Sequence, residues 1–90
     1  MQDTIFITSL IIRVRPDKWL PVTDSLAVIN NLEVTASAVE SGKMVAVFES
    51  ESLADITAVI DRIEKINGVV GATMVYQYSD SATVLNEEIA

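Results

Sequence analysis

The amino-acid sequence predicts an α+β domain in which one antiparallel sheet is covered by two helices on a single face. Three observations lead to this fold class. An apolar run rich in β-branched residues lies near the N-terminus, two later segments repeat apolar residues at helical spacing, and three others alternate in polarity. We place a single domain at residues 1–78 and expect an acidic, mobile C-terminal tail at residues 79–90.

The first predicted strand runs from Ile5 to Val14, and Arg15 and Pro16 stop it. A strand that is apolar on both faces is usually central in its sheet. One face of this strand carries Phe6, Thr8, Leu10, Ile12 and Val14. The other face carries Ile5, Ile7, Ser9, Ile11 and Arg13, and it becomes polar toward its end.

Apolar residues recur at near-helical spacing from Leu20 to Ile29 and predict the first helix. Asp17 is a candidate N-cap, although Pro21 fits the first turn best, so regular helix is expected to begin nearer Pro21. Asn30 and Asn31 are expected to end this helix, because asparagine tolerates the left-handed cap conformation.

Residues 32–39 alternate in polarity and predict a half-buried strand. Residues 40–42, with a glycine at the end, predict a short hairpin connection to a third strand at residues 43–49. These two strands are therefore expected to pair with each other.

The second helix has the clearest pattern in the chain, with apolar residues at spacings of three and four from Leu53 to Ile66. Ser52 begins a sequence that resembles a capping box with Asp55 in place of glutamate. Asp61 and Lys65 form a favourable pair four residues apart. A C-cap signal at Asn67 and Gly68 ends the helix, and a last strand follows at residues 69–78.

The element order is therefore strand, helix, strand, strand, helix, strand. Two split βαβ units with right-handed crossovers give a ferredoxin-like sandwich with strand order 4-1-3-2. The residues expected to meet the helices are Phe6, Leu10, Ile12, Val34, Ala36, Met44, Ala46, Phe48, Val70, Ala72 and Met74. The opposite face is expected to present Ile5, Ile7, Ser9, Ile11, Val45, Val47, Val69, Gly71, Thr73 and Val75.

Composition argues against several classes of function. Thirteen acidic residues against six basic ones give a net charge of -7, which disfavours nucleic-acid binding. The chain has no cysteine and no histidine, and we find no nucleotide-binding glycine motif. We therefore expect no catalytic residues, no metal and no cofactor. We also expect a cytoplasmic protein without membrane insertion, since no run approaches the length of a membrane span.

The sheet face opposite the helices is the candidate functional surface. Apolar side chains with the small residues Ser9, Gly71 and Thr73 among them form a predicted trough, and Glu33 and Glu49 lie at its rim. An apolar patch of this kind usually marks an interaction site. The pattern leaves two occupants open: a second copy of the chain, or a peptide or protein with apolar and basic parts.

Three segments together resemble the NapD family. They are Ser9–Ile12, then Glu33–Val34 followed by Ser41–Glu49, and Gly68–Val70 running on to Met74–Tyr76. The likeness extends from about Thr8 to Gln77 and rests on the order and spacing of the three segments. None of the three is specific by itself.

The resemblance implies a ferredoxin-like chaperone without enzymatic activity. Its partner would be the twin-arginine signal peptide of the periplasmic nitrate reductase catalytic subunit. Binding of this peptide would delay export of the subunit until the molybdenum cofactor is in place. The expected peptide-binding residues are Ile7, Ser9, Ile11, Glu33, Val45, Val47, Glu49, Thr73 and Val75. The alternative is a ligand-sensing or structural homodimer stacked through the same face, and self-association stays open.

Overall fold

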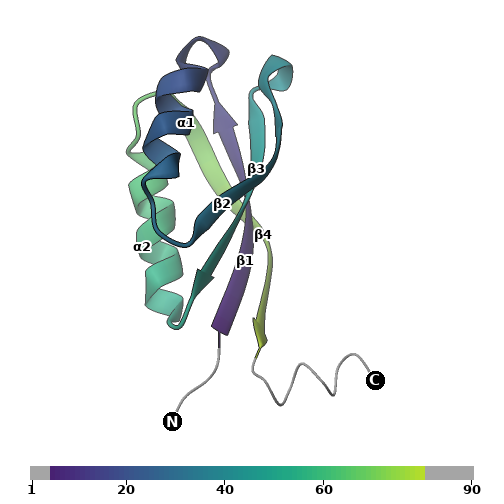
Figure 1. Ribbon diagram of the computed structural model, residues 1–90, viewed down its shortest axis with the longest axis vertical. Coiled ribbons are helices and arrows are strands. Elements are labelled where there is room, and N and C mark those ends of the chain that lie inside the picture. The colour runs from purple at the N-terminus through teal and green to yellow at the C-terminus, as the bar shows by residue number, and fades with distance from the viewer. Residues whose placement is uncertain (1–4, 81–90) are drawn as a thin grey trace.

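The computed structural model describes residues 5–80, with side chains for residues 5–77. The order of strands and helices is as predicted (Figure 1). The elements are β1 (Ile5–Val14), the 3₁₀ helix η1 (Pro16–Lys18), α1 (Trp19–Ala27), β2 (Leu32–Ala38), the 3₁₀ helix η2 (Val39–Ser41), β3 (Lys43–Ser50), α2 (Leu53–Glu64) and β4 (Val69–Asp80). β4 thus extends beyond the expected end at residue 78, and the rest of the predicted tail, residues 81–90, lies outside the described residues.

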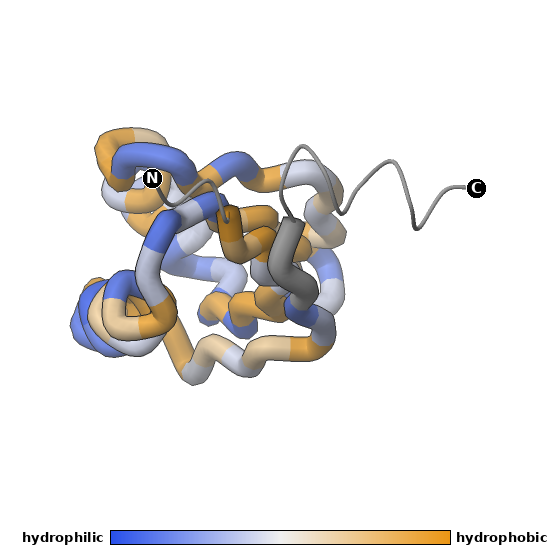
Figure 2. The backbone as a smooth tube through the Cα atoms, turned by 90° about the horizontal axis from the view of Figure 1, so that it is seen from below, coloured by the Kyte–Doolittle hydropathy of each residue, from blue (hydrophilic) through white to orange (hydrophobic). Residues whose placement is uncertain are grey.

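The four strands form one antiparallel sheet in the order β2-β3-β1-β4. This is the predicted order 4-1-3-2 read from the other edge, and β1 is central as its composition indicated. Both helices lie on the same side of the sheet when the molecule is seen from below (Figure 2). The ferredoxin-like α+β prediction is confirmed, and the sheet is left with one face that the helices do not cover.

The hydrophobic core lies between the helices and the sheet. On β1, Thr8, Leu10, Ile12 and Val14 are buried in strict alternation. The buried apolar residues of the other helices and strands are Val22, Leu26, Met44, Ala46, Phe48, Ile56, Val59 and Ile63. All the residues of β1 and β3 that were predicted to meet the helices lie in this core or pack against it.

The first helix begins differently from the expectation. The chain turns through η1 before α1 starts at Trp19. No side chain caps the N-terminus of η1 or of α1, so the prediction of Asp17 as N-cap is wrong. The Asp17 carboxylate lies 3.6 Å from Arg15 Nε instead. Trp19 packs half-buried against the core, and Asn31 takes the left-handed conformation, with φ of 67°, just before β2.

The second helix is capped by Ser52, whose Oγ accepts a hydrogen bond from the Ala54 N–H at 3.1 Å. Asp61 and Lys65 form the expected ion pair, at 2.9 Å. We expect Ser52→Ala to lower the free energy of unfolding by about 1 kcal/mol, because the N–H then loses its partner. Urea denaturation followed by circular dichroism measures this loss. Thr57→Ala, an exposed change on the same helix, is the control, and an equal effect of the two variants would contradict the cap.

Irregular pairing in the edge strand β2 moves residues between the two faces of the sheet. The register shifts between Val34 and Ala36, so Thr35 is not paired with a residue of β3, although its Oγ1 donates a hydrogen bond to the Val45 carbonyl oxygen at 3.3 Å. Ala36 therefore lies opposite Val45, on the uncovered face, and its predicted contact with the helices is wrong. Val34 was predicted to meet the helices; it lies opposite the buried Ala46 but is 38% exposed.

The other edge strand, β4, has two register shifts. The first places Val69 opposite the buried Val14, so Val69 packs against the core and Val70 is exposed, the reverse of the prediction. The second places Tyr76, instead of Val75, opposite Ser9. Met74 was predicted to meet the helices; it lies opposite the buried Leu10 but is 46% exposed.

Two loops hold the C-terminal end of β1 through glycine carbonyls. The Val14 N–H donates to the Gly42 oxygen at 2.7 Å, and the Arg15 N–H donates to the Gly68 oxygen at 2.9 Å. Gly42 has φ of +69°, and a Cβ there would collide with the Val14 carbonyl oxygen. The close approach therefore requires glycine, and it fixes the β2–β3 connection against the end of β1.

Candidate functional site

The uncovered sheet face, called the open face below, is built on the uninterrupted pairing of β1 with β3. Ser9 lies opposite Val47, and Ile11 lies opposite Val45. Together with Ile7 these side chains are half-buried, although the two helices of the described residues lie on the other face of the sheet. We call the five residues the apolar floor: Ile7, Ser9, Ile11, Val45 and Val47.

Residues of the edge strands β2 and β4 extend the cross-strand pairs of the apolar floor to both sides. Glu33 of β2 lies opposite Val47. Thr73 of β4 lies opposite Ile11. The structure thus brings Glu33 and Thr73 to the same face as the floor, where the sequence placed them. Val75 lies at the second shift in β4, without a paired residue in β1, and is 52% exposed.

Two residues that were not predicted to lie on the open face belong to it. Tyr76 is paired with Ser9 and is 58% exposed, and Ala36 is paired with Val45. Both reach this face because a register shift precedes them, and simple alternation of polarity carries no sign of such a shift. The small Ala36 helps to form a hollow of about 190 Å³ beside Val45.

The two ends of the open face carry different charges. At one end Arg13 of β1 lies directly opposite Lys43 of β3, and both are exposed. At the other end Glu49 lies opposite Ile7. Two ion pairs are found within residues 5–77, Arg15 with Asp17 and Lys65 with Asp61, so neither end has its charges neutralised within the described part of the chain.

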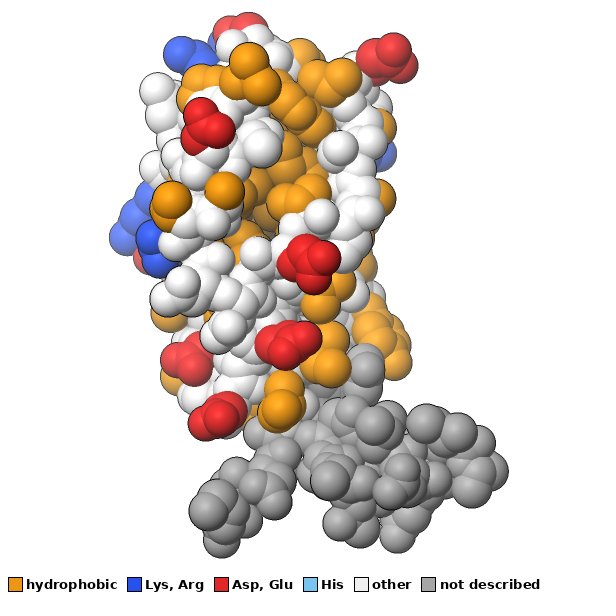
Figure 3. Space-filling view, in the orientation of Figure 1, with side chains coloured by type: hydrophobic (Ala, Val, Ile, Leu, Met, Phe, Trp, Pro, Cys, Tyr) orange, Lys and Arg blue, Asp and Glu red, His pale blue; other side chains and the backbone are white. Residues whose placement is uncertain are grey.

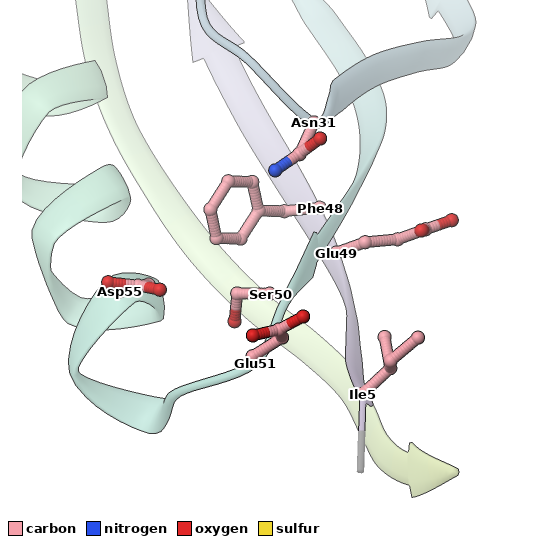
Figure 4. A pocket seen from close by; sticks show the side chains of 7 residues that line it. All are labelled: Ile5, Asn31, Phe48, Glu49, Ser50, Glu51 and Asp55. Carbon is pink, nitrogen blue, oxygen red and sulfur yellow. The ribbon is translucent and has the colours of Figure 1, made fainter. Parts of the chain in front are cut away.

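A depression of about 380 Å³ adjoins the acidic end of the face (Figure 4). Its lining residues are Ile5, Asn31, Phe48, Glu49, Ser50, Glu51 and Asp55. Phe48 points toward the helix layer and Glu49 points to the opposite side, as expected for consecutive strand residues. Glu49 near the end of β3, Glu51 in the connection that follows and Asp55 in the first turn of α2 thus line a depression whose lining contains no Lys or Arg.

The space-filling view shows the same separation of charge along the length of the molecule (Figure 3). Its lower part, where β3 ends and α2 begins in Figure 1, shows acidic but no basic side chains among those described. The upper part shows side chains of both signs. A partner with a basic segment is therefore attracted to one end of the molecule over the other.

The model of the NapD protein family matches residues 5–81 of the sequence. The chain belongs to the NapD family. Among solved structures, the solution structure of the E. coli Tat proofreading chaperone protein NapD superimposes with a TM-score of 0.77 at 22% sequence identity, over 84% of this chain and 80% of that chain. No curated protein matches the sequence.

Membership of the NapD family confirms the resemblance inferred from the three sequence segments. The match includes all four strands and both helices, and therefore the whole open face. Among the described residues there is no group of three or more acidic side chains arranged to hold a metal ion. No helix in the described part of the chain is both long and apolar enough to cross a membrane.

Proposed function

We propose that this NapD-family protein is a cytoplasmic chaperone that binds a twin-arginine signal peptide on its open face. Its cargo in this proposal is the catalytic subunit of a periplasmic nitrate reductase, whose export is delayed until the cofactor has been inserted. The signal peptide must be held before transport, which places the chaperone in the cytoplasm. The protein acts by binding, without catalysing a reaction.

The observation that carries this proposal is the uncovered apolar floor with carboxylates at one end. A twin-arginine signal has a basic segment followed by an apolar one. Ile11, Val45 and Val47 offer apolar area for the second part, and Glu33 and Glu49 offer acceptors for arginine. Ser9 and Thr73 can hydrogen-bond the peptide. A sequence with both parts therefore fits this face better than a purely apolar or purely charged one.

The solved structure of E. coli NapD supports the same assignment. It is described as a Tat proofreading chaperone, and it shares the fold over most of both chains. At 22% identity this structural similarity supports a common fold. The match to the family model supports membership of the same family. Transfer of the chaperone role to this chain is our proposal.

Calorimetric titration with a twin-arginine signal peptide tests the function. We expect saturable binding with a dissociation constant in the micromolar range or tighter, and weaker binding when both arginines are replaced by alanine. High salt should weaken binding to the arginine peptide more than to the alanine peptide, because salt screens exposed ion pairs.

The outcome that contradicts the proposal is an absence of binding at micromolar peptide. Equal affinity for the arginine and alanine peptides would also contradict it, since the carboxylates would then have no part in recognition. Analytical ultracentrifugation of the free protein tests the alternative function, a homodimer stacked through the open face. A stable dimer that buries the open face, together with no peptide binding, would favour the stacked homodimer.

A further inference from the structure

The charged residues of the open face form a gradient that runs parallel to its strands. β3 begins with Lys43 and carries Glu49 near its end, and both point to the same side as Val45 and Val47 between them. The rows of Arg13 and Ile7 lie about 20 Å apart along β1 at the usual rise per strand residue. The apolar floor thus lies between a basic end and an acidic end.

The basic end is not explained by the stability of the sheet. Arg13 and Lys43 are directly opposite each other across β1 and β3, and like charges in that position destabilise a cross-strand pair. The structure gives neither of them an acidic partner within the described residues. The hollow of about 190 Å³ near Lys43 has walls that include Ala36, Ala38 and Val45, so this end offers apolar space as well as positive charge.

The acidic end is suited to a cation. The larger depression is lined by Glu49, Glu51 and Asp55, and none of them forms an ion pair with another described residue. Ile5, two residues before Ile7 on β1, lines the depression together with Glu49, and Glu49 is the cross-strand partner of Ile7 at the end of the apolar floor. Glu33 lies one row further in, on the edge strand, opposite Val47.

We propose that the open face binds its peptide in one direction only. The basic N-terminal part lies over the acidic depression, with an arginine paired to Glu49, and the apolar part runs along the floor toward Arg13 and Lys43. This inference rests on the proposed function, since it concerns the peptide of that same site. It also assigns Glu49, rather than Glu33, as the main acceptor for arginine.

Physical complementarity favours this direction at both ends. The reverse direction would place the arginines beside Arg13 and Lys43, where like charges repel, and would leave the carboxylates of the depression unpaired. A helical peptide segment of about 13 residues spans the same 20 Å. Its C-terminal carbonyls carry partial negative charge, which the basic end would also favour.

Paramagnetic relaxation in NMR spectra of the full chain tests the direction. The probe is a synthetic peptide with an Arg-Arg pair followed by leucines and alanines, carrying a nitroxide at either its N-terminus or its C-terminus. We expect the N-terminal label to broaden amide signals around Ile7 and Glu49, and the C-terminal label to broaden those around Arg13 and Lys43. The opposite pattern, or equal broadening of both ends by each label, would overturn the proposal.

A charge exchange supplies a second test with an unchanged net charge. In the double variant Lys43→Glu, Glu49→Lys the gradient is inverted while the apolar floor is intact. We expect its affinity for the probe peptide to fall about tenfold. A peptide of reversed sequence, with the Arg-Arg pair last, should then bind the variant better than it binds the unmodified protein. An unchanged preference between the two peptides would contradict the proposal.

Replacing one glutamate at a time with glutamine distinguishes the contributions of Glu49 and Glu33 to peptide binding. Glu49→Gln should weaken binding about fivefold, in the upper range for an exposed ion pair. The matched control is Glu40→Gln, because Glu40 is exposed on η2 beside the basic end and should leave affinity unchanged. A larger loss with Glu33→Gln than with Glu49→Gln would overturn the assignment of the arginine acceptor.

These outcomes are distinct from failure of the proposed function. If the peptide binds without a preferred direction, the chaperone role stands and the directional proposal fails. If no twin-arginine peptide binds at all, both fail together.

Discussion

Val47→Glu is expected to lower affinity for a twin-arginine peptide by at least about tenfold, while the domain remains folded. Val47 is half-buried in the middle of the apolar floor, between Ser9 and Glu33 on the neighbouring strands. An apolar peptide segment would have to cover the new carboxylate, and burial of an unpaired charge is strongly unfavourable. Titration calorimetry measures the affinity, and thermal denaturation followed by circular dichroism measures stability.

The expected loss of stability in this variant is small. The new carboxylate faces Glu33 across the strands, and like charges in such a pair cost less than about 1 kcal/mol. Leu20→Glu is the matched control, because Leu20 is 74% exposed in the first turn of α1, within the helix layer. It adds the same charge and should leave peptide binding unchanged.

Two results would contradict the role of Val47. Unfolding of the Val47→Glu variant would mean that this side chain belongs to the core. A gain in affinity would mean that arginines, and not apolar residues, lie over this row of the face.

Leu10→Ala is expected to lower the free energy of unfolding by about 3 kcal/mol, because Leu10 is fully buried and the change leaves a cavity in the core. This corresponds to a fall in Tm of about 15 °C for a domain of this size. The folded fraction should bind peptide with unchanged affinity, since Leu10 points to the helices and not to the open face. Urea denaturation and titration below the transition temperature measure the two quantities.

The adjacent residue gives the matched comparison. Ile11 lies opposite Val45 on the open face and is half-buried. Ile11→Ala should cost about 1 kcal/mol of stability, for the smaller apolar area that it loses, and should weaken peptide binding. If Leu10→Ala and Ile11→Ala change stability equally, the two faces of β1 do not have the separate roles assigned to them.

The central strands were predictable from the sequence because their pairing has no interruption. The register between β1 and β3 is regular from Phe6 opposite Ser50 to Arg13 opposite Lys43. Where pairing is regular, alternation of residues translates directly into two faces. Position in the sequence alone therefore predicts that Leu10 and Met44 contact the helices. It also predicts that Ile11 and Val45 lie together on the open face.

The edge strands were predicted less well for a physical reason. An extra residue in one strand reverses the orientation of the residues that follow it, and polarity does not signal where this happens. Register shifts precede or include the residues whose face was predicted wrongly or not predicted, which are Ala36, Val69, Val70 and Tyr76. Asp17 failed as a cap because η1 comes before α1, and a short 3₁₀ segment has no periodicity of its own to detect.

The candidate site divides in the same way. The floor residues of β1 and β3 could be listed from the sequence, while Tyr76 and the depression under Glu49 required the spatial arrangement of separate segments. The residue pattern by itself did not distinguish a stacked homodimer from a peptide-binding face, because an apolar floor serves either one. The family match favours the peptide, and the charges at the two ends of the floor agree with it.

The central position of β1 also has a consequence for folding. Its partners are distant in the sequence: Ile11 pairs with Val45 on one side and with Thr73 on the other. Contacts of such long sequence separation make folding slower than that of a helical domain of equal size, because the loop must close before the pairing stabilises it. During synthesis the first strand is made early but lacks one of its partners until β4 has emerged. A complete open face therefore arises only when translation of the domain is nearly finished.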